Sequence, residues 1–88
     1  MKKPALELVA RALCRLDGHP ENIMFEGKPM WQSFLPNARA ALMELQNPTD
    51  AMAEVGAKSA HDLVLDVDAH GARTIFAAMI DAALIDGA

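Results

Sequence analysis

The chain has little of what stabilises small secreted domains. It holds a single cysteine, Cys14, so no disulfide can form within it. Its aromatic residues are three phenylalanines and one tryptophan, and there is no tyrosine. A core made mainly of Leu, Ile, Met and Ala favours close-packed helices over a sheet. No apolar run approaches the roughly 20 residues that a membrane-spanning helix needs, so we expect no membrane partner.

Basic residues are also few, with eight Lys and Arg against twelve Asp and Glu. Residues 1–46 carry six basic and five acidic side chains, whereas residues 47–88 carry two basic and seven acidic ones. Because affinity for nucleic acid rests first on cations that neutralise phosphate, this balance disfavours a nucleic-acid partner. The apolar run after Lys2 and Lys3 is interrupted by Glu7, Arg11 and Arg15, unlike a signal peptide. We expect a cytoplasmic protein.

The hydrophobic pattern predicts an all-α fold. With 88 residues, 52% of them hydrophobic, residues 1–88 form a single helical domain that buries roughly 60–65% of its unfolded surface. The expected architecture is a small compact bundle of three longer helices plus one short helix. The longer helices are expected at residues 4–16, 29–46 and 69–85, and the short one follows Thr49 and ends at Gly56.

Local signals define these helices further. The apolar face of residues 4–16 is expected to consist of Leu6, Val9, Leu13 and Leu16, at helical spacing. Pro36 interrupts residues 29–46, and we expect one continuous but bent helix, because the apolar stripe keeps its phase across the proline. The alternative is a separate short turn before a helix that begins near this proline.

Two capping positions are predicted. Thr49 suits the N-cap of the short helix, and Asp66 or Asp68 suits that of the last one. Between them, "LVLDV" is rich in β-branched residues, but the chain offers no second strand for it to pair with. Residues 57–67 are therefore expected to form a short helical or irregular connection that buries Leu63, Val64 and Leu65. Gly87 is expected to end the last helix.

The stretch "DGHPENIMFEGKPMWQSF", residues 17–34, differs from its alanine-rich surroundings. Large aromatic residues in small domains are mostly core residues. We therefore expect a packed connection in which Phe25 and Trp31 close the end of the bundle, above Ile23 and Met24. The functional alternative is the lip of a shallow pocket, which would be formed by His19, Glu21, Glu26 and Trp31.

The residue spacing does not favour catalysis or metal binding. Zinc sites use short paired spacings, whereas His61 and His70 are nine residues apart and Cys14 and His19 straddle a helix end. A cysteine within a helix is more often a small core residue than a nucleophile. We expect no catalytic, cofactor-binding or metal-binding residues, and a protein that is not an enzyme.

The four segments "VARALCR", "W…ARAALMEL", "PTDAMAEVG" and "AAMIDAAL" occur in this order. As a set they resemble small proteins encoded in alphaproteobacterial genomes and in their phages or prophages. The resemblance covers most of the chain and thins out over residues 57–70; Pro36 departs from it. That group has no assigned activity, so the resemblance implies a bacterial or phage-related setting and no catalytic residue.

A non-enzymatic protein-interaction module remains the best interpretation. Leu8, Met30 and Met43 lie away from the apolar stripes of their own helices, and methionines suit adaptable apolar surfaces. These three residues are the expected partner surface, for a second copy or for another protein. The structural alternative is that a thin domain simply uses both sides of its second helix. A further alternative is a small phage-type regulatory protein that contacts nucleic acid through the basic face of residues 4–16.

Overall fold

Helices form the frame of the molecule, as the hydrophobic pattern predicted. The computed structural model describes residues 3–86 and, within them, contains four α-helices. They are α1 (Ala5–Leu16), α2 (Leu35–Glu44), α3 (Asp50–Asp62) and α4 (Ala69–Ile85). Between α1 and α2 lie a small antiparallel hairpin, β1 (Met24–Phe25) and β2 (Lys28–Pro29), and a 3-10 helix, η1 (Met30–Phe34). The all-α class and the bundle are confirmed.

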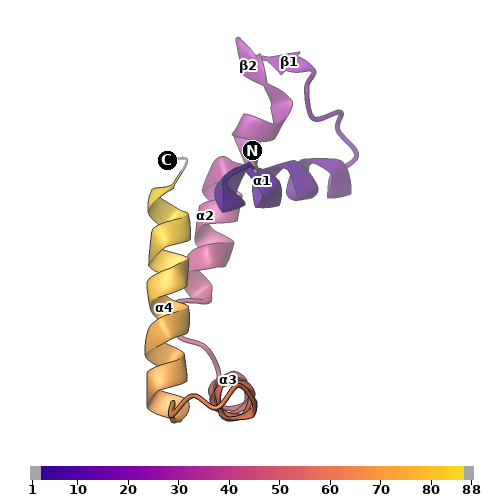
Figure 1. Ribbon diagram of the computed structural model, residues 1–88. Helices are drawn as coiled ribbons and strands as arrows, with labels where there is room; N and C mark the ends of the chain where they lie inside the picture. The colour runs from indigo at the N-terminus through magenta and orange to yellow at the C-terminus, as the bar shows by residue number, and fades with distance from the viewer. Residues whose placement is uncertain (1–2, 87–88) are drawn as a thin grey trace.

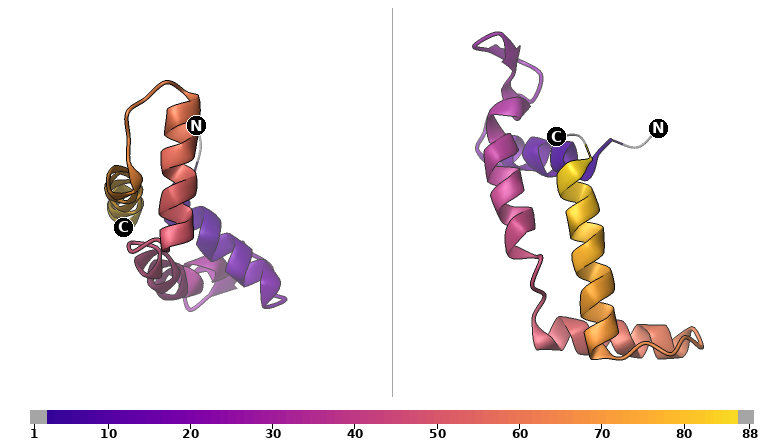
Figure 2. Two further views of the ribbon diagram at one scale, coloured as in Figure 1. Left: turned by 90° about the horizontal axis from the view of Figure 1, so that it is seen from below. Right: turned by 90° about the vertical axis from the view of Figure 1, so that its left-hand side faces the viewer.

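The core lies where α1 crosses the pair formed by α2 and α4. These two helices run side by side, and α1 lies across one end of them (Figures 1 and 2). The buried cluster consists of Leu6, Ala10, Ala38, Leu42 and Ile80. Two of the five are alanines, so the helices approach closely and the buried apolar volume is small. The stability of the protein therefore depends on few large side chains.

The buried face of α1 differs from the predicted one. Leu6, Ala10 and Cys14 are buried, at spacings of four residues, whereas Leu16 is 84% exposed. The larger residues Val9 and Leu13 flank this line and are partly buried. The reason is that α1 contacts η1 and α2 at a crossing, where small side chains sit at the closest approach and Leu16 lies beyond it.

Pro36 does not bend a continuous helix, so that prediction was wrong. The five residues of η1 form a separate turn, and Pro36 lies in the first turn of α2. A proline is tolerated there because the first backbone N–H groups of a helix have no partner within it. The alternative reading of the sequence, a short turn followed by a helix that begins near Pro36, describes what is observed.

Helix α3 is longer than predicted because Gly56 does not end it. The helix continues to Asp62, and Gly56 faces α4. A Cβ atom placed on Gly56 would lie 3.0 Å from the Cβ of Ala72, closer than carbon atoms normally approach. The glycine thus allows α3 and α4 to cross at short distance. Among the described elements, α3 makes its main tertiary contacts with α4.

The arrangement of α3 gives the molecule an elongated outline. Figure 2 shows α3 crossing the foot of α4 and projecting to one side of it. The extents are 49 × 26 × 19 Å, and the radius of gyration is 16.1 Å. A compact domain of this length has a radius of gyration of about 12 Å. Helix α3, the following turn and the first two thirds of α4 (together residues 50–79) are called the arm below.

Both predicted caps are present. The Thr49 hydroxyl accepts a hydrogen bond of 3.2 Å from the backbone N–H of Met52. The Asp68 carboxylate accepts one of 2.7 Å from the backbone N–H of Gly71, which identifies Asp68 as the cap of α4. The helix ends at Ile85, as predicted; the expected stop at Gly87 lies outside the described residues.

The cap of α4 leads to a testable expectation. Asp68→Ala removes the acceptor for Gly71 N–H and is expected to lower the free energy of unfolding by about 1 kcal/mol. Asp66→Ala, two residues earlier on an exposed segment, is the matched control and is expected to change it by less than about 0.5 kcal/mol. Urea denaturation followed by circular dichroism measures both. Equal losses in the two variants would contradict the capping role.

Candidate interaction surface

The residues proposed as a pocket lip are divided between an ion-pair cluster and a turn. Arg11 Nε donates to Glu7 Oε2 at 2.7 Å, and its Nη1 donates to Glu21 Oε1 at 3.2 Å. Arg15 Nη1 donates to the other Glu21 oxygen at 2.9 Å. The Arg11 guanidinium also lies 4.8 Å from the centre of the Trp31 ring, a cation–π contact. The cluster ties the connection that follows α1 back onto that helix.

The other two members of the lip lie apart from this cluster. His19 Nε2 is 3.1 Å from Asp17 Oδ2, and its ring is tilted by 45° to that of Phe34 with a centroid separation of 6.4 Å. Glu26 occupies the hairpin turn with a positive φ of 52°. The hairpin residues Ile23, Met24 and Phe25 are about half exposed, so the prediction that they pack onto the core was wrong. Pairing of β1 with β2 satisfies the backbone here without burying the side chains.

The ion-pair cluster predicts a specific pH dependence. Hydrogen bonds from Arg15, and then from Arg11, lower the pKa of Glu21 below its ordinary value of 4.5. A carboxylate with a lowered pKa contributes stability that is present above its ordinary pKa and is lost as the pH falls through the lowered one. Glu21→Gln is therefore expected to reduce stability at pH 7 and to reduce its loss on acidification below about pH 4.5.

Urea unfolding followed by the fluorescence of Trp31, the single tryptophan, measures this dependence between pH 3 and pH 7. Glu26→Gln, in the exposed hairpin turn, is the matched control and is expected to leave the wild-type profile unchanged. A Glu21→Gln profile parallel to that of the wild type would show that the two arginines do not stabilise the Glu21 carboxylate.

The predicted partner residues Leu8, Met30 and Met43 lie on three different elements. Leu8 on α1 is 40% exposed, Met30 is half-buried at the start of η1, and Met43 on α2 is exposed. Met30 and Met43 lie near opposite ends of the η1–α2 rod, about 20 Å apart by helical rise. The structure does not bring them together, and exposed apolar side chains gather elsewhere.

That gathering is on the arm. Within residues 50–79, six large apolar side chains are each more than half exposed; they are Val55, Leu63, Val64, Leu65, Ile75 and Met79. We call them the arm surface. Residues 63–65 were expected to be buried, and this prediction was wrong. They follow the C-terminal end of α3, where no other described element covers their side chains. Single exposed apolar residues are ordinary, whereas a group confined to neighbouring elements is typical of an interaction site.

A shallow apolar groove accompanies these side chains. It has a volume of about 190 Å³ and lies where α3 meets α4. Its lining residues are Gly56, Ala60, Val67, Ala72, Ile75, Phe76 and Met79. The groove exists because the positions at the helix crossing are Gly and Ala, which leave space beside the larger side chains. Groove and arm surface share Ile75 and Met79.

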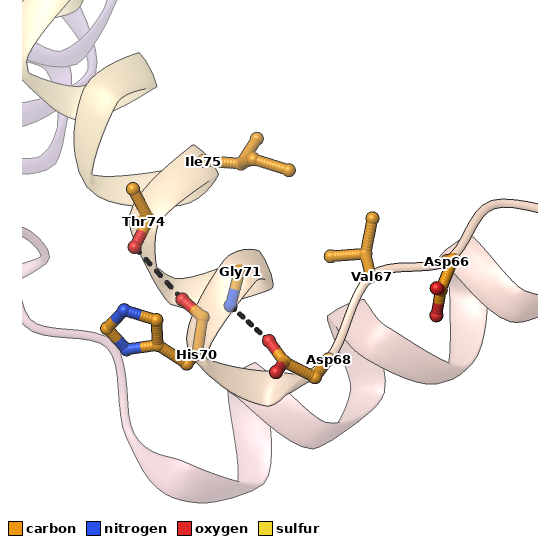
Figure 3. A pocket seen from close by; sticks show the side chains of 7 residues that line it. All are labelled: Asp66, Val67, Asp68, His70, Gly71, Thr74 and Ile75. Atoms are coloured by element: carbon orange, nitrogen blue, oxygen red, sulfur yellow. Dashed lines mark hydrogen bonds between the residues drawn. The ribbon is translucent and has the colours of Figure 1, made fainter.

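A larger hollow of about 580 Å³ lies at the N-terminus of α4, and its polar groups serve the fold. Asp68 caps the helix, and the Thr74 hydroxyl donates to the carbonyl of His70 at 3.0 Å. Figure 3 shows the His70 ring pointing away from Asp66, so these two side chains do not converge on one point. Within residues 3–86, no three His, Cys, Asp or Glu side chains meet as a metal site would require.

Cys14, the candidate nucleophile, lies in the interior of the protein. Its side chain is fully buried, and its thiol is 3.6 Å from the carbonyl oxygen of His19. Burial raises the pKa of the Cys14 thiol, as do Glu21 and Asp17, against the smaller opposite effects of Arg15 and Arg11. A buried, protonated thiol is a poor nucleophile. The position is that of a small core residue.

The chain was compared with protein families, with curated proteins and with solved structures. No family model, no curated protein and no solved structure matches it. None of the described helices is both long and apolar enough to cross a bilayer.

Proposed function

We propose that this protein is a non-enzymatic protein-interaction module and that its binding site is the arm surface. The observation that carries the proposal is the exposure of six large apolar side chains on consecutive elements of a small protein. Burial of such a side chain stabilises a protein or complex by about 1.5–3 kcal/mol. These side chains stay largely exposed in the helical bundle. A partner with an apolar surface would bury them, and the complex would gain this free energy.

The charged side chains favour a protein partner over a nucleic-acid partner. Arg11 and Arg15, which form the basic face of α1, are already paired with Glu7 and Glu21. Contact with phosphate would have to compete with these carboxylates. The arm itself carries an excess of acidic residues over basic ones, which repels phosphate and is compatible with a protein partner. The four segments that resemble small alphaproteobacterial and phage proteins are the basis on which we also propose a bacterial or phage-related setting.

The experiment is affinity capture with three tagged baits in a lysate of the organism that encodes the chain. The baits are the wild type, Met79→Glu on the arm and Leu16→Glu on α1. Both substituted residues are well exposed, so both variants are expected to fold, which circular dichroism checks. Proteins captured by the wild type and by Leu16→Glu, with untagged copies of the chain counted among them, are expected to be lost with Met79→Glu. Identical captures by all three baits would overturn the proposal.

A further inference from the structure

We infer that the partner on the arm surface is a second copy of this chain, in a two-fold dimer. In this dimer, the turn that carries Val64 in each copy occupies the α3–α4 groove of the other. The inference rests on the proposed function, because it names the occupant of the same surface. Three observations support it: the area left exposed, the pairing of a groove with a projection on one arm, and the backbone conformation of Val64.

The first observation is the accessible surface, which is 6286 Å². A folded monomer of 9.5 kDa exposes about 5,000 Å² on average, so the excess is roughly 1,200 Å². A stable protein–protein interface of standard size takes about 800 Å² from each partner. The molecule as a whole thus exposes enough additional surface for one such interface, and the exposed apolar side chains of the arm are part of that surface.

The second observation is that the arm carries both an apolar groove and a projecting turn with apolar side chains. The groove of about 190 Å³ is apolar, and an apolar cavity of about 150 Å³ is large enough to hold benzene. It can therefore accept one or two aliphatic side chains. The turn at the far end of α3 offers Leu63, Val64 and Leu65, all exposed. A two-fold axis brings the turn of each copy to the groove of the other, so that the same contact forms twice.

The third observation is the conformation of Val64. The backbone N–H of Val64 donates to the carbonyl of His61 at 2.9 Å, and that of Leu65 donates to the carbonyl of Ala60 at 2.8 Å. These two bonds are those of a Schellman motif, which ends a helix with one residue in the left-handed region, usually glycine. Val64 occupies that position with a φ of 62°, which is unfavourable for a β-branched residue.

No packing contact within its own chain compensates for the backbone strain at Val64, since its side chain is 93% exposed. Glycine would end the helix at lower cost. A valine side chain at this place contributes only if it contacts something outside the chain. In the proposed dimer it contacts the groove lined by Ala72, Phe76 and Met79 of the other copy.

The substitution Val64→Gly separates a structural role from a binding role. It relieves the strain, so it is expected to raise the unfolding temperature of the monomer, measured at concentrations at which both proteins are monomeric. It also removes the projecting side chain, so it is expected to weaken dimerisation at least tenfold. A merely structural residue would not move these two quantities in opposite directions.

Sedimentation velocity and light scattering of the purified protein, from micromolar to about millimolar concentration, measure the association. The wild type is expected to be a concentration-dependent dimer that persists at high salt, because apolar contacts are not screened. Met79→Glu is expected to be monomeric throughout, and Leu16→Glu to dimerise as the wild type does. With dissolved oxygen as the oxidant, a mixture of Val64→Cys and Met79→Cys proteins is expected to form a disulfide between copies, and neither variant is expected to form it when mixed with the wild type.

Other outcomes overturn the inference in distinguishable ways. A wild type that stays monomeric removes the second copy as the partner, and arm-dependent capture of another protein would then still support the proposed function. A dimer that Val64→Gly and Met79→Glu leave intact places the interface elsewhere. A mass that grows without limit shows head-to-tail association in place of a closed two-fold dimer.

Discussion

Replacing Leu6 with alanine is expected to lower the free energy of unfolding by about 3–5 kcal/mol, the range for fully buried leucines that leave a cavity. Leu6 is 1% exposed and belongs to the cluster at which α1 meets α2 and α4. Two of the other four members of that cluster, Ala10 and Ala38, are too small to move into the space. A chain of this length has a total stability of about 4–13 kcal/mol, so this loss is a large fraction of the total and the variant is expected to unfold at a markedly lower temperature than the wild type.

The matched control is Leu16→Ala, the same change on the same helix at an exposed position. It is expected to alter the free energy of unfolding by no more than about 0.5 kcal/mol. Urea denaturation followed by circular dichroism gives both values at 25 °C. A loss below about 1 kcal/mol for Leu6→Ala would mean that the crossing of α1 over α2 and α4 does not carry the core.

The two helices with the strongest signals were predicted closely. Helices α1 and α4 lie close to where Pro4, the capping residues and the apolar periodicity indicate, and Asp68 caps α4 as one of two candidates. The buried face of α1 was predicted only in part, because periodicity shows which residues share a side and not where a neighbour crosses. At the crossing, Ala10 and Cys14 are buried, whereas Leu16 lies beyond it and is exposed.

Two predictions that concerned a glycine and a proline were wrong. Gly56 resembles a helix end when only its neighbours in sequence are considered; its role is the close approach to Ala72, which lies sixteen residues later. Pro36 was placed inside a helix because the apolar stripe continues through η1. Residues three positions apart, such as Trp31 and Phe34, share a side in a 3-10 helix as well as in an α-helix, so the pattern could not distinguish the two arrangements.

The candidate site was harder to predict than the fold. Residues 63–65 form an apolar run, and burial was the natural expectation because most such runs lie in the core. Their exposure follows from the direction of α3, which the crossing with α4 determines. One signal in the sequence did point to them: the run had no second strand with which to pair. Likewise, the contact of Trp31 with Arg11 joins residues twenty positions apart, and local patterns do not encode it.

Gly56→Leu is expected to separate α3 from α4 and to cost about 1–3 kcal/mol, the usual cost of overfilling a packed contact. Even a single Cβ at this position would lie 3.0 Å from the Cβ of Ala72, and a leucine adds three further carbon atoms. For Gly56→Ala the gain in helix propensity, about 1 kcal/mol, opposes the same contact, so little net change is expected. The difference between the two variants isolates the steric effect.

The effect should be local, because α3 is attached mainly through α4 and through Arg73, which donates to Asp50 Oδ1 at 2.6 Å and to the carbonyl of Pro48. Hydrogen exchange is therefore expected to accelerate in α3 in Gly56→Leu while the amides of α1 and α2 keep their protection. Ala51→Leu, at an exposed position of the same helix, is the control and should leave exchange unchanged. Uniform loss of protection in Gly56→Leu would contradict this, since it would mean that the arm and the core unfold as one unit. Protection restored by adding Ala72→Gly would confirm that the contact between these two residues sets the distance between α3 and α4, and with it the groove that the proposed dimer needs.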